Sequence, residues 1–598
     1  MENDDSLRSV VWEVALENSV RYGGQADLKS VLGRIMKEHP EYRQSSAQVK
    51  EIIESLITEI GQMSLEEQNQ KLLEFNPEFA PHEKKRGPEK KVLPDLSNVT
   101  GEVVMRMAPY PSGALHIGNA RMIVLNDEYV KRYGGKLILF YDDTIGTTKA
   151  GLEGDPDAKF ILPESYDLID EGLDWLGVQV HERYWKSDRV DLYQEYAKLL
   201  LERGEAYVCT CDAEEFRQNF KKPGLDCPDR DLAVEDNLAR WDQMLDGSYA
   251  EGAAVVRLKT GMQNKNPAIR DHIIMRISDA PHPRIGDKCR VWPLMDFSQG
   301  IDDYLIGITH IIRGTDLAKE GEIERIFWQM MGWPDKEIIL YGKLSFGTEF
   351  KLSKTFQRKM IEDGTYVGWD DPRTWSLQSL AARGIQPDAL RQALLDLGLS
   401  KNAINFDKAW VYAKNTKLID TSSDRIFFVQ NPVSMHITGI PFEELVAKPL
   451  INPSLPDKGN REILVTISNG ELDVCVTKSD VFGESEVAGG HAAAIEIGSN
   501  VRLKDLFTVT ISGINDEIAA EFYQKELEDH KEMRKVQWVD FTNNIPVKIL
   551  QPDGVFTTGL AESNLALMAE GSFAQFERYG YVRVIKKEGD NILCYFIN

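Results

Sequence analysis

Residues 103–141 constrain the fold of this 598-residue chain more than any other segment. A short β-like run at 103–105 leads into a stretch with two prolines and two glycines, Pro109, Pro111, Gly113 and Gly118, which cannot lie inside a helix or a central strand. A helical pattern then runs from Asn119 to about residue 133, two glycines end it, and residues 136–141 form a second strand pattern. Strand, loop, helix and strand in this order predict a βαβ unit of a doubly wound α/β fold.

The same periodicities predict the organisation of the rest of the chain. Residues 5–75 have apolar positions near a period of 3.6, which indicates helices, and the charged run at 82–91 is better explained as a solvated linker than as a nucleic-acid contact. Strand candidates at 308–312 and 338–341, with a helix at 318–331, indicate that the α/β fold is split by an insertion of about residues 190–300. From about residue 426, short β-rich runs between turn residues suggest small antiparallel barrels.

The composition limits the functional classes that the chain can belong to. Hydrophobic residues make up 42% and charged residues 28%, and no run approaches the ~18 apolar residues that a membrane span needs. The amino terminus lacks the pattern of a signal peptide, and six cysteines are too few for a disulfide scaffold, so we expect a cytoplasmic protein. The formal charge of −25 argues against sequence-independent nucleic-acid binding, but it leaves room for a local basic surface.

Two separate segments carry groups that suit phosphate binding. The loop at 109–119 combines glycines that admit a ligand to the backbone, a helix start with free N–H groups, and His116. About 235 residues later, Lys351 and Lys354 flank Ser353, a pair that suits closure over a polyphosphate. Either segment alone is weak, whereas the two in this order are much more specific.

Together these segments resemble the HIGH and KMSKS signatures of class I aminoacyl-tRNA synthetases, as HIGN at 116–119 and KLSKT at 351–355. The surrounding sequences are similar to those of the glutamyl/glutaminyl subclass: RMAPYPSGALHIGNAR, YDDT, VWPLMDF, DDYLIGITHIIRG and GWDDPRTWSLQSLAARGIQPDALR. The helical start and barrel-like end resemble the archaeal type of glutamyl-tRNA synthetase. The resemblance covers nearly the whole chain.

The resemblance implies an α/β fold with a Rossmann-like catalytic core. The implied domains are a helical extension and linker (1–96), the catalytic domain with an acceptor-binding insertion at about 190–300 (97–345), the KMSKS loop with a helical connector (346–425), and a β-barrel anticodon-binding domain (426–598). The implied activity is that of a glutamate–tRNA ligase, which uses ATP and Mg²⁺ to join L-glutamate to the 3′ end of tRNA(Glu). It leaves the charging of tRNA(Gln) open. A glutaminyl-tRNA synthetase and an inactive tRNA-binding paralogue are the alternatives.

The resemblance also assigns roles to single residues. The implied catalytic residues, which contact the phosphates, are His116, Lys351 and Lys354. The other implied ATP-binding residues are Pro109, Ser112, Gly113, Gly118, Asn119 and Ser353. The implied amino-acid pocket consists of Arg106, Tyr110, Asp142, Met295, Gln299 and Arg313. In that pocket Arg106 is expected to pair with the substrate carboxylate, and Asp142 is expected to hold the α-amino group.

Arg313 favours glutamate over glutamine as the substrate. An anionic side chain in a partly dry pocket needs a cationic partner, and a guanidinium matches a carboxylate at two points, whereas a neutral amide has no such need. The alternative interpretation of Arg313 is a buried ion pair with Asp302, Asp303 or Asp316.

Three positions depart from the family pattern. Asn119 replaces the last histidine of the first signature, Phe140 stands where an arginine is common, and Met295 replaces a tyrosine. Because asparagine can still donate a hydrogen bond, we expect the reaction class to be kept. The lost hydroxyl at Met295 changes how the substrate is oriented.

Two further segments carry candidate sites. The insertion contains three cysteines at a spacing that suits a metal, Cys209, Cys211 and Cys227. Zinc needs four ligands, and Asp229 is the candidate for the fourth, but no histidine or further cysteine lies nearby, so reduced thiols without a metal are the favoured interpretation. In the segment 368–373, the resemblance implies contacts with the inside of the tRNA elbow for Asp370, Asp371 and Arg373.

Overall fold

The structure is a computed structural model that describes residues 2–21, 26–39, 42, 45–64, 67–68, 70–72, 92–147, 149, 158, 160–346, 352–482, 494–515, 517–525 and 533–598. The expected linker at 82–91 and the expected catalytic residue Lys351 lie outside the described residues. The chain divides into two compact units, residues 1–89 and residues 90–598.

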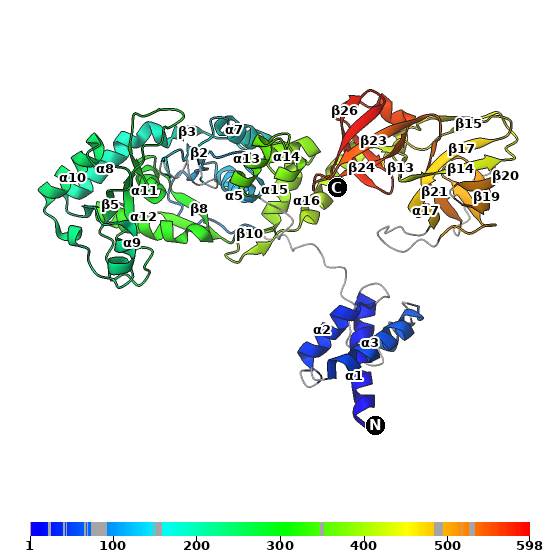
Figure 1. Cartoon of the computed structure of the whole chain (residues 1–598), viewed down its shortest axis with the longest axis horizontal. Helices are drawn as coiled ribbons and strands as arrows, with labels where there is room; N and C mark the ends of the chain where they lie inside the picture. Colours follow the sequence, from blue (N-terminus) through cyan, green and yellow to red (C-terminus); the bar gives the residue numbers. More distant parts are fainter. Residues whose placement is uncertain are drawn as a thin grey trace. The chain divides into compact units, whose positions relative to one another are not determined.

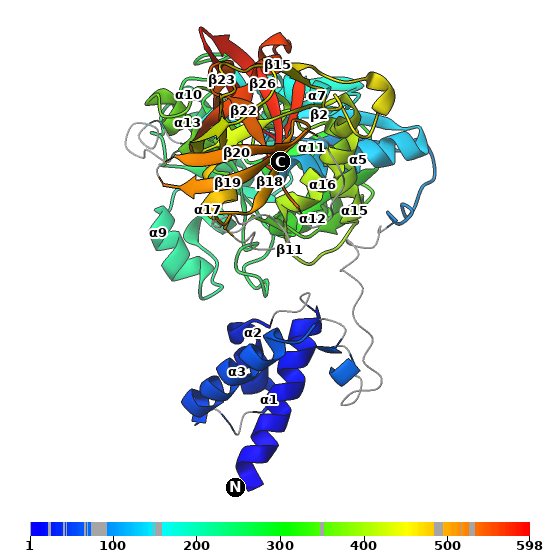
Figure 2. The ribbon, with the colours of Figure 1, turned by 90° about the vertical axis from the view of Figure 1, so that its right-hand side faces the viewer.

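The first unit is helical, as the apolar period predicts. Its helices are α1 (Glu2–Arg21), α2 (Leu28–Glu38) and α3 (Ser46–Gly61), drawn in dark blue in Figures 1 and 2. Helix α2 begins after Asp27, whose carboxylate accepts a hydrogen bond from Ser30 N at 2.8 Å. The three helices enclose a core of their own, which includes Val11, Ile35 and Leu56.

The second unit begins with a parallel sheet. Strands β1 (Val104–Met107), β2 (Lys136–Tyr141) and β3 (Glu182–Trp185) are parallel neighbours, and β8 (His310–Gly314) and β9 (Glu337–Tyr341) form another parallel pair. Thr309 N donates to Val104 O at 2.9 Å, which places β8 beside β1 and gives the order β3-β2-β1-β8-β9. That order is the one found in doubly wound nucleotide-binding folds.

The strand expected at 308–312 begins two residues later than predicted. Ile308 N donates to Asp303 O at 2.9 Å, so residue 308 still closes the end of helix α11 (Met295–Leu305). The sheet ladder therefore starts at His310. The expected helix at 318–331 is confirmed as α12 (Ala318–Met331).

Side chains of the sheet alternate between two helical layers. On β2, Leu137, Leu139 and Tyr141 pack with α5 (Ile117–Tyr133), α7 (Ser165–Trp175) and helices that follow the sheet in the chain. Ile138 and Phe140 face the opposite side, in a cluster with α11, α12 and α8 (Val190–Glu202). Because successive strand residues point to opposite faces, both faces of this sheet are buried, which confirms the predicted α/β class.

A separate antiparallel sheet lies between β3 and β8 in the chain. Its strands, in spatial order, are β4 (Ala206–Cys209), β5 (Val255–Leu258), β6 (Ile273–Ile277) and β7 (Val291–Pro293). Helices α8 and α10 (Val234–Asp246) contribute to its core. This sheet occupies the region where the sequence predicts an insertion.

Helices connect the parallel sheet to the C-terminal part. They are α13 (Lys354–Glu362), α14 (Leu377–Arg383), α15 (Pro387–Asp396) and α16 (Lys408–Ile419). The start of α14 is tied to the loop that precedes α5, because Leu377 N donates to Leu115 O at 2.8 Å and Ile117 N donates to Trp375 O at 3.1 Å. The connector therefore positions the predicted phosphate loop directly.

Two seven-stranded, barrel-like sheets form the C-terminal part. The first has the order β12 (Asp424–Ile426), β25 (Phe573–Phe576), β26 (Gly580–Glu588), β27 (Asn591–Phe596), β23 (Asn544–Leu550), β24 (Phe556–Glu562) and β13 (Phe428–Gln430). The second has the order β21 (Arg534–Val536), β18 (Asn500–Leu503), β19 (Thr508–Ile514), β20 (Ile518–Gln524), β14 (Pro432–Thr438), β17 (Leu472–Thr477) and β22 (Trp538–Asp540). Most neighbouring strands pair antiparallel, as the sequence suggests, but β12–β25, β23–β27, β14–β20 and β18–β21 are parallel. Long connections set these directions, and local periodicity carries no information about them.

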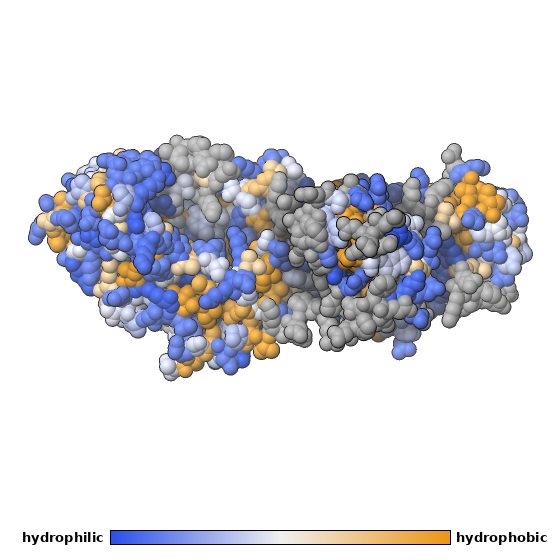
Figure 3. Space-filling view, turned by 90° about the horizontal axis from the view of Figure 1, so that it is seen from below, coloured by the Kyte–Doolittle hydropathy of each residue, from blue (hydrophilic) through white to orange (hydrophobic). Residues whose placement is uncertain are grey.

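The hydrophilic surface agrees with the high fraction of charged residues in the sequence. The face shown in Figure 3 is mostly hydrophilic, with scattered hydrophobic patches. Among the residues that the structure describes, no helix is long and apolar enough to cross a membrane.

The connector and the first barrel-like sheet share a close contact at Gly384. Its φ is +92°, and a Cβ there would lie 2.6 Å from Cε1 of Phe573. We expect Gly384→Ala to destabilise the protein by about 1–3 kcal/mol more than Gly364→Ala, because Gly364 has a similar φ of +76° but nothing within 4 Å of its Cβ position. Calorimetric thermal unfolding measures the difference. Equal shifts for the two variants would contradict the role of this contact.

Candidate active site

Two adjoining cavities lie at the carboxyl edge of the parallel sheet. Their volumes are about 560 and 830 Å³, and both are lined by Pro109, Tyr110, His116, Asn119, Met295 and Leu352. The residues that follow β1, β2 and β8 contribute to their walls. Since β1 lies between β2 and β8, this edge is the topological switch point at which doubly wound folds bind ligands.

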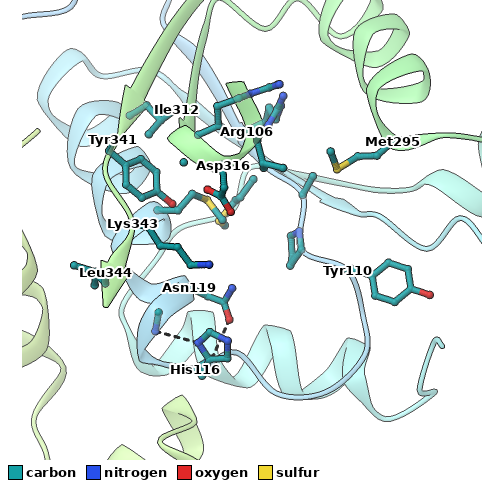
Figure 4. A pocket seen from close by; sticks show the side chains of 18 of the residues that line it. Arg106, Tyr110, His116, Asn119, Met295, Ile312, Asp316, Tyr341, Lys343 and Leu344 are labelled. Atoms are coloured by element: carbon teal, nitrogen blue, oxygen red, sulfur yellow. Dashed lines mark hydrogen bonds between the residues drawn. The ribbon is translucent and has the colours of Figure 1, made fainter. Parts of the chain in front are cut away.

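His116 caps helix α5 at the floor of the two cavities (Figure 4). Its Nδ1 accepts a hydrogen bond from Gly118 N at 3.0 Å, and its backbone N donates to Asn119 Oδ1 at 3.2 Å. Burial, and then the nearby charge of Lys354, lower the pKa of the imidazole to about 3. The ring is therefore neutral, and because Nδ1 accepts, the proton lies on Nε2.

Lys354, in the second signature at 351–355, contacts the loop that precedes α5. Its Nζ donates to Gly113 O at 3.1 Å, and it lines the larger cavity beside Ser353. Gly113 has φ +143°, and a Cβ there would lie 2.3 Å from the ring of Trp369, so this close approach requires glycine. The structure thus brings together two signatures that lie far apart in the sequence.

The remaining expected ATP-binding residues surround this contact. Pro109 O accepts a hydrogen bond from Asp142 N at 3.1 Å, and Ser112 lines the larger cavity. Ser353 caps helix α13 by accepting from Phe356 N at 3.4 Å. These contacts fix backbone positions around the cavity, while their proposed contacts with ATP stay predictions.

The smaller cavity contains alternating acidic and basic side chains. Arg106 donates through Nε and Nη2 to the two oxygens of Asp303, each at 2.9 Å. Gln299 Nε2 donates to Asp303 Oδ1 at 3.0 Å, and the buried Oε1 of Gln299 accepts no hydrogen bond. Arg106 is thus already held by a carboxylate of the protein, and its predicted pairing with the substrate would add to that contact.

Arg313 also lines the smaller cavity, and it is only 4% exposed. Its Nη2 donates to both oxygens of Glu324, at 3.0 and 2.8 Å, whereas its buried Nε and Nη1 have no hydrogen-bond partner. The alternative interpretation from the sequence, an ion pair with Asp302, Asp303 or Asp316, names the wrong partner. The carboxylate that pairs with Arg313 is that of Glu324 on helix α12. Unpartnered guanidinium donors on a residue that lines a cavity indicate a site for an anionic or strongly polar ligand.

Asp142 follows β2 and lines the larger cavity. Lys186 Nζ lies 3.0 Å from its Oδ1 and also donates to Ser298 Oγ at 3.0 Å. Tyr110 and Met295 lie where the two cavities meet. Burial, together with the charge of Asp142, raises the pKa of the Tyr110 hydroxyl well above its usual value, so this hydroxyl stays protonated.

The sequence reasoning missed several residues of the site. They are Lys186, Asp316, Glu324, Tyr341 and Lys343, of which Asp316, Tyr341 and Lys343 border the smaller cavity in Figure 4. Lys186, Asp316 and Lys343 each follow the end of a parallel strand, so the strand-end rule could have found them. Glu324 lies inside a helix and has no such local signal.

The cysteine cluster forms in the insertion. The sulfur atoms of Cys209, Cys211 and Cys227 all lie within 4.8 Å of one another. Asp229 Oδ1 accepts from Arg240 Nη1 at 2.7 Å, so the expected fourth ligand already has a cationic partner. Burial raises the pKa of Cys211 to about 11, which opposes a thiolate there. The cluster offers three ligands of the four that zinc prefers, and reduced thiols stay the favoured interpretation.

The segment 368–373 packs against the first barrel-like sheet. Asp371 is 1% exposed, and Arg373 donates to its two oxygens at 2.8 and 2.7 Å. A Cβ on Gly554 would lie 2.5 Å from the Arg373 side chain, so this ion pair contacts the turn after β23. Asp370 is exposed. The expected tRNA contact at these residues stays a prediction, with Asp370 as the accessible carboxylate.

Comparisons with known proteins agree with this geometry. The family model "tRNA synthetases class I (E and Q), catalytic domain" matches residues 102–420, and two models described as its anti-codon binding domain match residues 423–527 and 535–585. The chain is 40% identical over 593 residues to the glutamate–tRNA ligase of Methanocaldococcus jannaschii, which covers 98% of this chain and 99% of the relative. It is 39% identical over 597 residues to the glutamate–tRNA ligase of Pyrococcus abyssi, which covers 99% of each.

The match to solved structures is more distant. A glutamate–tRNA synthetase from Elizabethkingia anophelis is 20% identical, with a TM-score of 0.38, and the match covers 53% of this chain and 71% of that chain. The family models and the whole-length relatives rest on much stronger similarity. The phosphate loop, the distant lysine signature and the anticodon-type sheets thus occur in one chain, which belongs to the class I (E and Q) family of tRNA synthetases.

Proposed function

We infer that the protein is a glutamate–tRNA ligase, which uses ATP to join L-glutamate to the 3′ end of a tRNA. The ligases to which it is similar have that name and match it over nearly its whole length. Within the site, the unpartnered Nε and Nη1 of Arg313 are the observation that favours glutamate as the amino acid. They are unused donors of a cationic residue that lines the smaller cavity, which suits the negatively charged side chain of glutamate.

The reaction consists of two transfers in which no protein side chain need act as the nucleophile. The carboxylate of glutamate attacks the α-phosphate of ATP and releases pyrophosphate, and a ribose hydroxyl of the tRNA then attacks the adenylate and releases AMP. The protein contributes position and fixed charge. His116 offers a neutral Nε2–H, and Lys354 offers a positive charge, on adjacent walls of the larger cavity. We assign Lys351 to the same task, with Mg²⁺ accompanying the ATP phosphates.

The selection of glutamate follows from desolvation. A carboxylate that enters the smaller cavity loses water, and the unpartnered Nε–H and Nη1 donors of Arg313 replace that water at a buried position. A neutral glutamine side chain has one acceptor oxygen and no negative charge, so it would interact more weakly with these donors. The same logic assigns the α-amino group to Asp142, which lines the neighbouring cavity.

The tRNA partners follow from the domain composition. The sheets matched by the anti-codon binding models would read the anticodon of tRNA(Glu), and tRNA(Gln) is a second candidate substrate. We place this activity in the cytoplasm.

A charging assay tests the proposed function. Purified tRNA(Glu) and tRNA(Gln) are each offered labelled glutamate and labelled glutamine, and the charged product is measured. We expect glutamate on tRNA(Glu), and glutamate on both tRNAs would identify an enzyme that does not discriminate between them. Glutamine on tRNA(Gln) alone would contradict the choice of amino acid, and no product with either tRNA would favour an inactive paralogue.

Substitution of Arg313 tests the basis of selection. We expect Arg313→Cys to lower kcat/KM for glutamate by about 10²–10³-fold, since truncating one partner of a buried ion pair costs about 3–5 kcal/mol. Arg325→Cys on the same helix as Glu324 is the control, because Arg325 is exposed and pairs only with the exposed Asp335. An unchanged kcat/KM in Arg313→Cys would refute the assignment.

Substitution of His116 tests the phosphate site. Loss of one preorganised donor costs about 10²–10³-fold in kcat, and we expect that loss in tRNA-dependent ATP–pyrophosphate exchange by His116→Ala. His39→Ala, at the end of helix α2 in the first unit, is the control and should keep the wild-type rate. Because the pKa of His116 is lowered to about 3, its neutral form persists above that value, and the exchange rate between pH 5.5 and 8 should show no step that His116→Ala removes.

A further inference from the structure

Glu324 is a carboxylate placed beside a cavity to which we assign a carboxylate substrate. It lines the smaller cavity from helix α12 and is 1% exposed. Both of its oxygens accept from a single nitrogen of Arg313, Nη2, at 3.0 and 2.8 Å. This contact occupies Nη2 and leaves Nε and Nη1 without hydrogen bonds among the described residues. Glu324 therefore fixes the orientation of Arg313 while the Nε–H and Nη1 donors stay available.

The packing around this pair is tight. A Cβ on Gly321, one turn before Glu324 on α12, would lie 3.6 Å from Nη1 of Arg313. A Cβ on Gly300, on α11, would lie 3.6 Å from Cγ of Glu324. Helices α11 and α12 therefore both pass beside this buried ion pair, and a change in its charge occurs in a packed environment.

A count of charges shows the consequence of substrate entry. Without substrate, Arg106 is balanced by Asp303 and Arg313 is balanced by Glu324, while the exposed Lys343 and Asp316 add one charge of each sign to the cavity lining. A glutamate side chain therefore adds a negative charge that no positive side chain of the cavity balances. Like charges that share a low-dielectric site cannot all stay ionised, and the usual response is that one of them takes up a proton.

We propose that Glu324 is a positioning residue that holds Arg313 through Nη2, so that its Nε–H and Nη1 donors stay available, and that takes up one proton from solvent when the side-chain carboxylate of glutamate binds there. The proposal rests on the proposed function, in which glutamate is the substrate. The proton converts Glu324 to a neutral acid. Arg313 then has a single anionic partner, which is the substrate.

The other charged groups around Glu324 agree with this choice of proton acceptor. Asp303 on α11 is held at two points by Arg106 from β1, and the charge of Lys336 acts on it as well, so Asp303 already has two cationic neighbours. Glu324 faces Arg313 from β8. Burial raises the pKa of Glu324, and the charge of Asp303 adds to that against the opposing charges of Arg313 and Arg106.

The proposed proton uptake makes the affinity for glutamate depend on pH. Below the pKa of Glu324 in the free enzyme, the carboxyl is already protonated and glutamate binding takes up no proton. Above it, binding takes up as much as one proton, and the affinity for glutamate falls by as much as tenfold per pH unit. A neutral glutamine side chain adds no charge and calls for no proton, so its binding lacks this dependence.

Calorimetric titration of the full-length protein with L-glutamate measures the proton directly. Binding enthalpies are compared in phosphate and Tris buffers, whose ionisation enthalpies differ, at several values between pH 6 and 8.5. We expect proton uptake to approach one per glutamate at the upper end for the wild type. We expect none for Glu324→Gln, which keeps an acceptor for Nη2 but cannot titrate. In parallel, KM for glutamate in tRNA charging should rise with pH in the wild type and stay flat in Glu324→Gln.

Glu322→Gln is the matched control, because Glu322 lies on the same helix but is exposed. It should keep the wild-type uptake and the wild-type pH profile. Absence of uptake in the wild type would overturn the proposal even if Glu324→Gln failed to fold, and uptake that persists in Glu324→Gln would assign the proton to another group. A protein that neither binds nor charges glutamate would instead refute the proposed function, so the two failures are distinguishable.

Discussion

The position of one loop controls the geometry of the whole site. The loop before α5 is fixed from the connector side by two backbone hydrogen bonds, Ile117 N to Trp375 O and Leu377 N to Leu115 O. Backbone contacts leave no rotamer freedom, so the surface that we propose for phosphate binding is set before any ligand arrives. Lys354 then contacts the same loop at Gly113 O. Because the connector leads into the barrel-like sheets, the loop is tied to the part of the chain that matches the anti-codon binding models.

The amino-acid cavity obeys a different constraint, which is the cost of buried charge. A lone guanidinium in this region would lose its hydration without compensation, and each arginine there has a carboxylate partner from the protein. The pairing at Arg106 uses two nitrogens, whereas the pairing at Arg313 uses one. The difference decides which arginine has donors left over. The ion pair of Arg313 with Glu324 thus compensates a buried charge and still leaves donors for the anionic ligand that we propose.

Sequence reasoning predicted features set by local periodicity and by short motifs. Helix α12 has the predicted bounds, and His116 and Lys354 meet as the two signatures imply. It failed where a contact joins distant segments through space. The partner of Arg313 is Glu324, eleven residues away on a different element, and nearer acidic residues were equally plausible from the sequence. The parallel pairs in the C-terminal sheets were missed for the same reason, since strand direction depends on connections and not on alternation.

Electrostatic interactions with the tRNA are exposed to solvent, whereas those with the amino acid are buried. The chain carries 70 basic and 95 acidic residues, so the long-range field of the protein opposes tRNA approach, and binding must rely on local basic groups close to the phosphates. Such contacts are exposed and screened, because the Debye length at physiological salt is about 8 Å, and each phosphate contact adds to the salt dependence. The ion pairs of the amino-acid cavity are buried and largely escape screening. Rising salt should therefore weaken the capture of tRNA while it leaves the choice of amino acid intact, and a change in amino-acid choice requires a change in protonation instead.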